Sequence, residues 1–247
     1  AMQQIVIQER DNRQAAGEKF YDDNQEYFGQ VSSDLQEMSD SYGELNLGNE
    51  VLSYETAVSM YRETAQTGVQ AGADLILIET MSDSYELKAA VLAAREAGFR
   101  PDTGERLPVF ATVIFDEKGK LLTGGNVEST VALLEGLRVD ALGINCGLGP
   151  VQMKGILEEI LRVSSLPVLV NPNAGLPRSE NGKTVYDIDA EGFALVMEEI
   201  VTMGAVVVGG CCGTTPAHIR ETVKRCRDIP VSLPMPKKRT VISSYAR

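Results

Sequence analysis

The chain has 247 residues, of which 23 are basic and 35 acidic, so its formal net charge is −12, and its hydrophobic fraction is 43%. This length suits a single α/β barrel domain, and the negative charge argues against nucleic acids and anionic membrane surfaces as partners. The sequence contains no apolar stretch of the roughly 20 residues that span a bilayer, and AMQQIVIQERDNRQ at its start lacks the layout of a secretory signal.

Residues 1–50 differ in composition from the rest of the chain. They hold 3 basic and 11 acidic side chains and are rich in glutamine. Only QQIVIQE (3–9) has the character of a strand, and we expect the remainder to be helical or partly ordered. Residues 1–50 are therefore predicted to form a divergent acidic N-terminal segment.

From residue 53 onward, short apolar runs alternate with segments of helical periodicity. The predicted helices cover residues 54–71, 84–97, 127–137, 150–163, 190–203 and 216–228. The predicted strands cover residues 74–79, 109–115, 141–145, 167–171 and 205–208. Several helix ends carry clear signals. Ser53 and Thr215 are predicted N-caps, Asp83 and Glu86 fit a capping box, Pro150 and Pro216 stand at first positions, and glycine follows the last residue of several helices.

The predicted strands are nearly continuous apolar runs, which is typical of a parallel sheet buried on both faces. Strict alternation of strands and helices leads either to a (β/α)8 barrel or to a doubly wound sheet. Residues 51–230 are predicted to form this α/β region. Residues 231–247 have no core pattern and are predicted to be a C-terminal linker or tail that leads towards further sequence.

Four cysteines that include a vicinal pair do not resemble a secreted disulfide framework, which favours a reduced, cytoplasmic setting. Cys146 follows the strand 141–145, and the pair Cys211–Cys212 follows the strand 205–208. Parallel α/β folds bind ligands at this carboxyl end of their strands. We therefore expect these three thiols to open onto one mouth. Cys226 lies about four turns further along the last helix and is predicted to be a buried helix residue.

A cup of three thiolates suits Zn²⁺ with its fourth position left for water or substrate. Because three thiolates outweigh the charge of the ion, such a site is a poor Lewis acid for a carbonyl group or for water. A substrate thiol is a better fourth ligand, since the metal keeps it deprotonated against a free pKa of about 8.5. The pattern favours alkyl transfer to a thiol.

Three motifs, GINCGLGP, NPNAGLP and GGCCGTTPAHI, in this order and spacing, closely resemble the zinc-dependent homocysteine S-methyltransferase family. This family includes the homocysteine-binding module of cobalamin-dependent methionine synthase and betaine–homocysteine methyltransferase. DLILIETMSDSYELKAA is similar to its central strand-helix unit, so the resemblance covers residues from about 50 to 230.

The resemblance implies a (β/α)8 TIM-type barrel in which Cys146, Cys211 and Cys212 bind zinc and the homocysteine sulfur takes the open position. It also implies that Glu79 holds the substrate ammonium group. Asn145 and Asn173, which lie in the first two motifs, are further substrate-binding candidates, and turn formation is the alternative for Asn173. His218 falls near the third position of the last helix, where a capping or surface role is favoured over catalysis.

Members of the family begin with an Asp-Gly-Gly or Asp-Gly-Ala-Met-Gly-Thr signature, and residues 1–50 contain neither. The barrel is therefore predicted to be incomplete or divergent at its N-terminal strands. A parallel barrel that lacks strands exposes sheet edges. We expect a partner, a second copy in a homo-oligomer or the N-terminal segment to cover them.

The predicted reaction is zinc-dependent methyl transfer to homocysteine, giving methionine. The resemblance implies S-methylmethionine, S-adenosylmethionine, betaine or a methylcorrinoid as donor. The C-terminal tail favours a methylcorrinoid protein or domain, and the absence of tryptophan disfavours betaine, whose quaternary cation binds aromatic groups.

Two other functions remain open. The loop GGCCGTT, with Thr214 and Thr215, could hold a phosphate ligand on backbone amides at a helix N-terminus. Alternatively, the chain could be a non-catalytic zinc-binding subunit or remnant that needs a partner.

Overall fold

The computed structural model describes residues 52–180, 183–237 and 240–243. The predictions for residues 1–50, including the strand at 3–9, lie outside these ranges and stay predictions. Contacts between residues divide the chain into Ala1–Leu52 and Ser53–Arg247, and the elements below all belong to the second unit. None of the helices in the described part combines the length and apolar character that a membrane crossing requires.

A five-stranded parallel sheet forms the centre of this unit, and its strands neighbour one another in chain order. The strands are β1 (Ile76–Met81), β2 (Val109–Val113), β3 (Ala141–Asn145), β4 (Val168–Asn171) and β7 (Val207–Val208). The helices in the described residues are α3 (Tyr54–Gln70), α4 (Ser84–Ala97), α5 (Val127–Gly136), α6 (Pro150–Val163), α7 (Ala190–Met203) and α8 (Pro216–Cys226).

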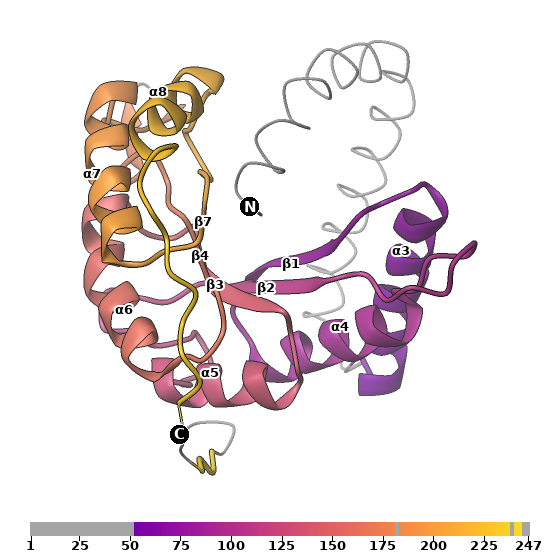
Figure 1. The fold of residues 1–247 in the computed structure, drawn as a ribbon. Helices are drawn as coiled ribbons and strands as arrows, with labels where there is room; N and C mark the ends of the chain where they lie inside the picture. The colour runs from indigo at the N-terminus through magenta and orange to yellow at the C-terminus, as the bar shows by residue number, and fades with distance from the viewer. Residues whose placement is uncertain (1–51, 181–182, 238–239, 244–247) are drawn as a thin grey trace. The chain divides into compact units, whose positions relative to one another are not determined.

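The strand order β1-β2-β3-β4-β7 decides between the two architectures that alternation allows. A doubly wound sheet reverses its order at a switch point, whereas a barrel adds each new strand beside the last. Here no reversal occurs among the described strands, and each helix from α5 to α8 contacts the next along the outer side of the sheet, as Figure 1 shows. The α/β architecture is confirmed, and the arrangement is that of a barrel wall that does not close within the described residues.

The helices begin and end close to where their capping signals predict. Ser53 accepts a hydrogen bond from the Thr56 amide at the start of α3, and Asp83 accepts from two amides at the start of α4. Pro150 opens α6, and Gly204, with a φ of 126°, ends α7. These signals act within one turn of the chain, which is why the sequence locates them well.

Some strands differ from the sequence-based expectation. The first strand covers Ile76–Met81 rather than 74–79, the second ends at Val113 rather than 115, and the last covers only Val207–Val208 of the predicted 205–208. A hairpin of β5 (Arg178–Glu180) and β6 (Lys183–Val185), which pair antiparallel, was not predicted because RSENGKTV contains no apolar run. The Asn-Gly dipeptide in that stretch is a strong hairpin signal that could have identified it.

The core lies between the sheet and the helices. All five residues of β3 are buried, and its backbone runs close to β4: a Cβ at Gly143 would lie 2.0 Å from the Leu169 carbonyl oxygen. The largest fully buried side chains include Leu142, Leu157 and Phe193, from β3, α6 and α7. This core fixes the carboxyl ends of β3, β4 and β7, where the cysteines follow.

Candidate metal centre

Three cysteine sulfurs converge at the carboxyl end of the sheet. Cys146 directly follows β3, and Cys211 and Cys212 follow β7 after two glycines. The Cys146 Sγ lies 3.7 Å from the Cys212 Sγ, which lies 4.0 Å from the Cys211 Sγ. All three sulfurs lie within 4.8 Å of one another. Within the described residues, the structure thus brings together the three thiols that the sequence predicts as ligands.

These separations fit a tetrahedral zinc ion. Zn–S bonds of about 2.3 Å at tetrahedral angles place two sulfurs about 3.8 Å apart. A disulfide would bring two sulfurs to about 2.05 Å, and all three cysteines are free. Cys212 is exposed while Cys146 and Cys211 are partly buried, so one side of the cluster stays accessible. The donor set therefore fits Zn²⁺ with room for a further ligand.

The backbone at Cys146 is bent so that its thiol meets the pair. Cys146 and Gly147 both have left-handed conformations, with φ values of 56° and 73°. For a residue with a side chain this is an unfavourable region that the surrounding structure must hold. The Cys146 amide donates to the Asn171 carbonyl oxygen at 3.1 Å, and the Leu148 amide donates to the Cys146 oxygen at 2.8 Å.

The segment after β4 holds the cysteine pair in place. The Cys211 amide donates to the Pro172 oxygen at 2.8 Å, and the Ala174 amide donates to the Cys212 oxygen at 2.9 Å. The Cys212 amide donates to Oδ1 of Asn173 at 3.1 Å. Asn173, predicted to contact the substrate, is 3% exposed, and its side chain contacts the loop that carries Cys211 and Cys212.

The same hydrogen bonds bear on the phosphate alternative. The amides of Cys211 and Cys212 are already bonded, the Thr214 amide donates to the Cys211 oxygen, and the Thr215 amide donates to Nδ1 of His218. A phosphate cradle needs amides that point at the ligand. Because these four amides are used within the protein, the loop favours presentation of sulfur over binding of phosphate.

Burial raises the pKa of the Cys211 thiol to about 12, and the neighbouring Cys146 adds to the shift. In the protein alone this sulfur is therefore protonated at neutral pH. A divalent cation reverses the balance because it stabilises thiolates directly. The site thus has three sulfur donors for a metal, and the positive charge of the metal is needed to deprotonate Cys211.

Asn145, the residue before Cys146, lies behind the sulfurs rather than among them. Its side chain is buried, at 1% exposure. Its amide bonds to Thr80 at the end of β1, to Thr112 in β2 and to the sulfur of Cys211. The predicted substrate residue is therefore surrounded by protein groups.

Glu79 stands on β1 at the edge of the sheet and is exposed. It borders a cavity of about 490 Å³ between α3, β1 and α4, which Tyr61, Thr80 and Glu86 also line. Thr80, the next residue, has a φ of 65°, which is rare for a β-branched side chain. The backbone directly after Glu79 is thus strained at Thr80, and hydrogen bonds between Thr80 and Asn145 hold this conformation.

Tyr186 is a residue at this site that the sequence did not reveal. Its ring lies against Gly213, where an added Cβ would come within 2.3 Å of the ring, and Gly213 has a φ of 79°. Burial raises the pKa of the Tyr186 hydroxyl, and a hydrogen bond with Cys212 adds to the shift. Only the tertiary structure places this tyrosine at the cysteines, because it lies more than 20 residues before them.

Two residues have the structural roles that the sequence predicts: one caps the last helix, and the other is buried within it. Nδ1 of His218 accepts from the Thr215 amide at 3.2 Å, and Nε2 of His218 lies 3.0 Å from the Ile188 oxygen, so its ring closes the first turn of α8. Cys226 is buried at 7% exposure and lies outside the sulfur cluster.

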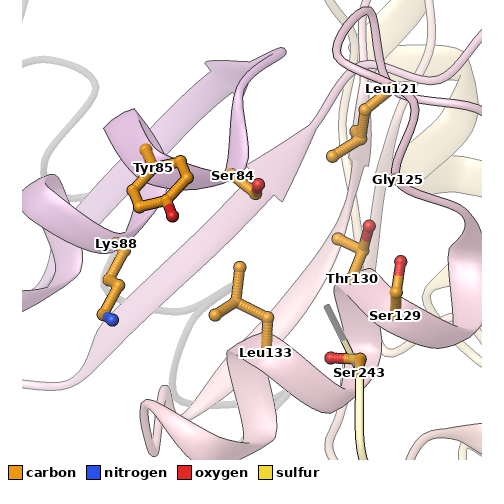
Figure 2. Close-up of a pocket in the computed structure, with 9 residues that line it drawn as sticks. All are labelled: Ser84, Tyr85, Lys88, Leu121, Gly125, Ser129, Thr130, Leu133 and Ser243. Atoms are coloured by element: carbon orange, nitrogen blue, oxygen red, sulfur yellow. The ribbon is translucent and has the colours of Figure 1, made fainter. Parts of the chain in front are cut away.

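A second cavity, of about 160 Å³, lies between α4 and α5 (Figure 2). Ser84, Tyr85 and Lys88 line it from α4, and Ser243 of the C-terminal tail closes one side. Among the described residues that line it, none carries a thiol, carboxylate or imidazole. It therefore contributes no group to the metal chemistry.

Comparison with known proteins identifies the family of this chain. The family model described as homocysteine S-methyltransferase matches residues 9–226. The methionine synthases of Mycobacterium leprae (strain TN) and Mycobacterium tuberculosis (strain ATCC 25618 / H37Rv) are 38% and 39% identical to this chain over 179 and 177 residues. Each match covers 71% of this chain and 15% of the relative, so the chain spans a small part of these proteins.

Among solved structures, the homocysteine methyltransferase MmuM from Escherichia coli matches with a TM-score of 0.57 and 27% identity. The match covers 72% of this chain and 60% of MmuM in its apo form, and 54% of MmuM in its metallated form. The range that the family model matches includes all three cysteines. This chain belongs to the homocysteine S-methyltransferase family.

Proposed function

We propose that this chain binds Zn²⁺ through Cys146, Cys211 and Cys212 and transfers a methyl group to the thiol of homocysteine, giving methionine. The observation that carries the proposal is the convergence of these three sulfurs within 4.8 Å at the carboxyl end of a barrel-type sheet. Membership of the family and the metallated form of MmuM support the same assignment.

The chemistry follows from the donor set. When bound, Zn²⁺ in a three-thiolate site keeps a substrate thiol deprotonated at neutral pH and leaves its sulfur nucleophilic. In the overall reaction the thiol loses its proton, the bond between the methyl carbon and the donor breaks, and a sulfur–carbon bond forms. The protein holds its thiols in place through the bent backbone at Cys146 and the hydrogen bonds that fix the loop 211–214.

The amino acid end of the substrate needs an anion for its ammonium group. Glu79 is the candidate, because it lies exposed at the end of β1 beside Thr80, which Asn145 links to Cys211. Asn145 and Asn173 are 1% and 3% exposed, which supports roles behind the cysteines for these two side chains. A methylcorrinoid carried on another protein or domain is the donor we propose to test first.

The decisive experiment compares two cysteine-to-serine variants of the full chain. Cys211→Ser removes one proposed ligand, and zinc content should fall from about one per chain to near zero because three ligands hold the ion. Cys226→Ser makes the same chemical change in α8, outside the cluster, and should retain the zinc. Equal zinc content in both variants would overturn the metal assignment.

Homocysteine binding and turnover complete the test. A binding isotherm should show homocysteine affinity in the zinc-loaded chain and its loss when a chelator removes the metal. Affinity unaffected by the metal would contradict the mechanism. Zinc binding without methyl transfer from any of the donors would favour the non-catalytic subunit instead.

A further inference from the structure

We infer that Asn145 is a positioning residue. Its side chain links the sulfur of Cys211 to the peptide between Glu79 and Thr80, and so fixes the position of the proposed zinc ligands relative to the carboxylate proposed to bind the substrate ammonium group. The substrate half of this inference rests on the proposed function. The metal half depends only on zinc binding by the cysteines.

The amide of Asn145 uses its full hydrogen-bonding capacity inside the protein. Oδ1 accepts from the Thr80 amide at 2.9 Å and from Oγ1 of Thr112 at 2.8 Å. Nδ2 donates to Oγ1 of Thr80 at 2.6 Å and to Sγ of Cys211 at 3.9 Å. A side-chain amide offers two donors and two acceptor lone pairs, so this network satisfies it completely.

The orientation of this amide is determined by its partners. A backbone N–H can only donate, so the atom that faces the Thr80 amide must be the oxygen of Asn145. The NH₂ group is therefore the part that faces Cys211. A flipped amide would place two donors against each other and leave the sulfur facing an oxygen.

The bond to Cys211 bears on the metal site. An N–H donated to a thiolate stabilises its negative charge and fixes the direction of its lone pairs. Groups that orient metal ligands in this way change metal affinity by about 10- to 100-fold when they are removed. Asn145 is the group in that position for Cys211, and its 1% exposure shields the interaction from water.

The bonds to Thr80 bear on Glu79. The Thr80 amide belongs to the peptide that joins it to Glu79, so Oδ1 of Asn145 holds that peptide directly. Thr80 has a φ of 65°, a costly conformation for a β-branched residue unless its surroundings hold it. The two bonds from Asn145 supply that support, and they set the direction in which the chain leaves Glu79.

Asn145→Asp tests both halves, because it keeps the shape and the acceptor oxygen but replaces the donating NH₂ with oxygen. Zinc affinity, measured by competition with a chromogenic chelator, should fall about 10- to 100-fold. The homocysteine dissociation constant of the zinc-loaded chain should rise as well. Replacement of zinc by Co²⁺ adds a spectroscopic readout, since the thiolate-to-metal absorption band should shift in the variant.

Thr130→Val is the matched control. Thr130 in α5 is 4% exposed, and its hydroxyl donates to the backbone oxygen of Asn126, the residue before this helix. The variant therefore loses a buried hydroxyl contact away from the sulfurs. It should lose some stability while zinc affinity and the Co²⁺ band stay as in the wild-type chain. If Asn145→Asp behaves like this control in zinc affinity and in homocysteine binding, the positioning role is wrong.

Should Asn145→Asp fail to fold, Thr80→Val tests the link from its other end. It keeps the branched shape and removes the acceptor of the 2.6 Å bond from Nδ2. The homocysteine dissociation constant should then rise about 3- to 10-fold, the range of one lost hydrogen bond, and unchanged affinity would overturn the inference. A wild-type chain without zinc would overturn the proposed function too, whereas normal zinc and homocysteine binding in the variants would overturn this inference alone.

Discussion

Strand β1 (ILIETM) begins within the apolar run DLILIE, and β3 is the similar run ALGIN, but the two strands lie in different surroundings. β3 pairs with β2 on one side and β4 on the other, and all five of its residues are buried. Among the described strands β1 pairs only with β2, and Leu75 just before it and Leu77 near its start are each 41% exposed. A continuous apolar run therefore predicts a strand whose side chains are buried on both faces, but the tertiary structure determines which elements pack against it.

The proposed metal ligands and the proposed substrate-binding carboxylate lie on or just after different strands of the sheet. Cys146 follows the buried central strand β3, whereas Cys211 and Cys212 follow β7, which among the described strands pairs only with β4 and is partly exposed. Among the described strands β1 ends the row (Figure 1), and Glu79 on this strand borders the cavity between α3, β1 and α4. We therefore expect metal binding to depend on β3 and on the hydrogen bonds that hold the loop after β7, and substrate binding to depend also on what lies against β1.

Gly143→Ala in β3 should have the largest effect on stability. The added Cβ would lie 2.0 Å from the Leu169 oxygen, so β3 and β4 cannot keep their spacing. We expect a loss of more than about 3 kcal/mol in the free energy of unfolding, measured by urea denaturation.

The control for Gly143→Ala is Gly155→Ala in α6, where an added Cβ meets nothing within 4 Å. This variant should be stabilised by about 0.5–1 kcal/mol, because alanine favours the helix. Similar effects in the two variants would mean that the centre of the sheet is less tightly packed than the coordinates indicate.

The second prediction compares the two strands directly with one chemical change. Leu142→Ala in β3 removes a side chain that is 1% exposed, and it should cost about 2–5 kcal/mol through lost burial and the resulting cavity. Leu77→Ala in β1 removes one that is 41% exposed and should cost less than about 1 kcal/mol. An equal cost for both, in urea denaturation of the full chain, would show that β1 is covered as completely as β3.

The third and smallest effect lies at the amino end of the central strands. Asp140 accepts two hydrogen bonds from Arg106, at 2.6 and 2.7 Å, and one from the Val109 amide at 2.8 Å. The Arg106 guanidinium lowers the pKa of the Asp140 carboxyl, and the Val109 amide lowers it further. Because the carboxylate is partly exposed, Asp140→Asn should cost about 1 kcal/mol at pH 7.

The pH dependence of this effect has a defined sign. A lowered pKa in the folded state means that the carboxylate contributes its stability above the unfolded pKa of about 3.9 and loses it as the pH falls through the folded value. The gap in unfolding free energy between wild type and Asp140→Asn should therefore close in acid. A gap that stays constant from neutral to acid pH would contradict the charge-based origin.

Much of the fold could be predicted because its signals are local. The caps at Ser53 and Asp83 and the prolines that open α6 and α8 act on the residues next to them, and the structure confirms them. The hairpin β5–β6 was missed because its strands are polar and depend on pairing with each other. The apolar run of β1 does not by itself show that β1 lies at the edge of the described sheet, since such a run is the same in a central strand and at an edge; only the missing family signatures in residues 1–50 pointed to an exposed edge.

For the candidate site, the sequence by itself predicted which residues carry the proposed chemistry: two adjacent cysteines at a glycine-rich strand end and a third after an earlier strand. Only the tertiary structure decided how they are supported. The bonds from Asn145 to Thr80 and Cys211 join residues 65 and 66 positions apart, and Tyr186 reaches Gly213 from another loop. Contacts over such separations depend on which strands become neighbours, and strand pairing is a property of the whole sheet rather than of any local stretch of sequence.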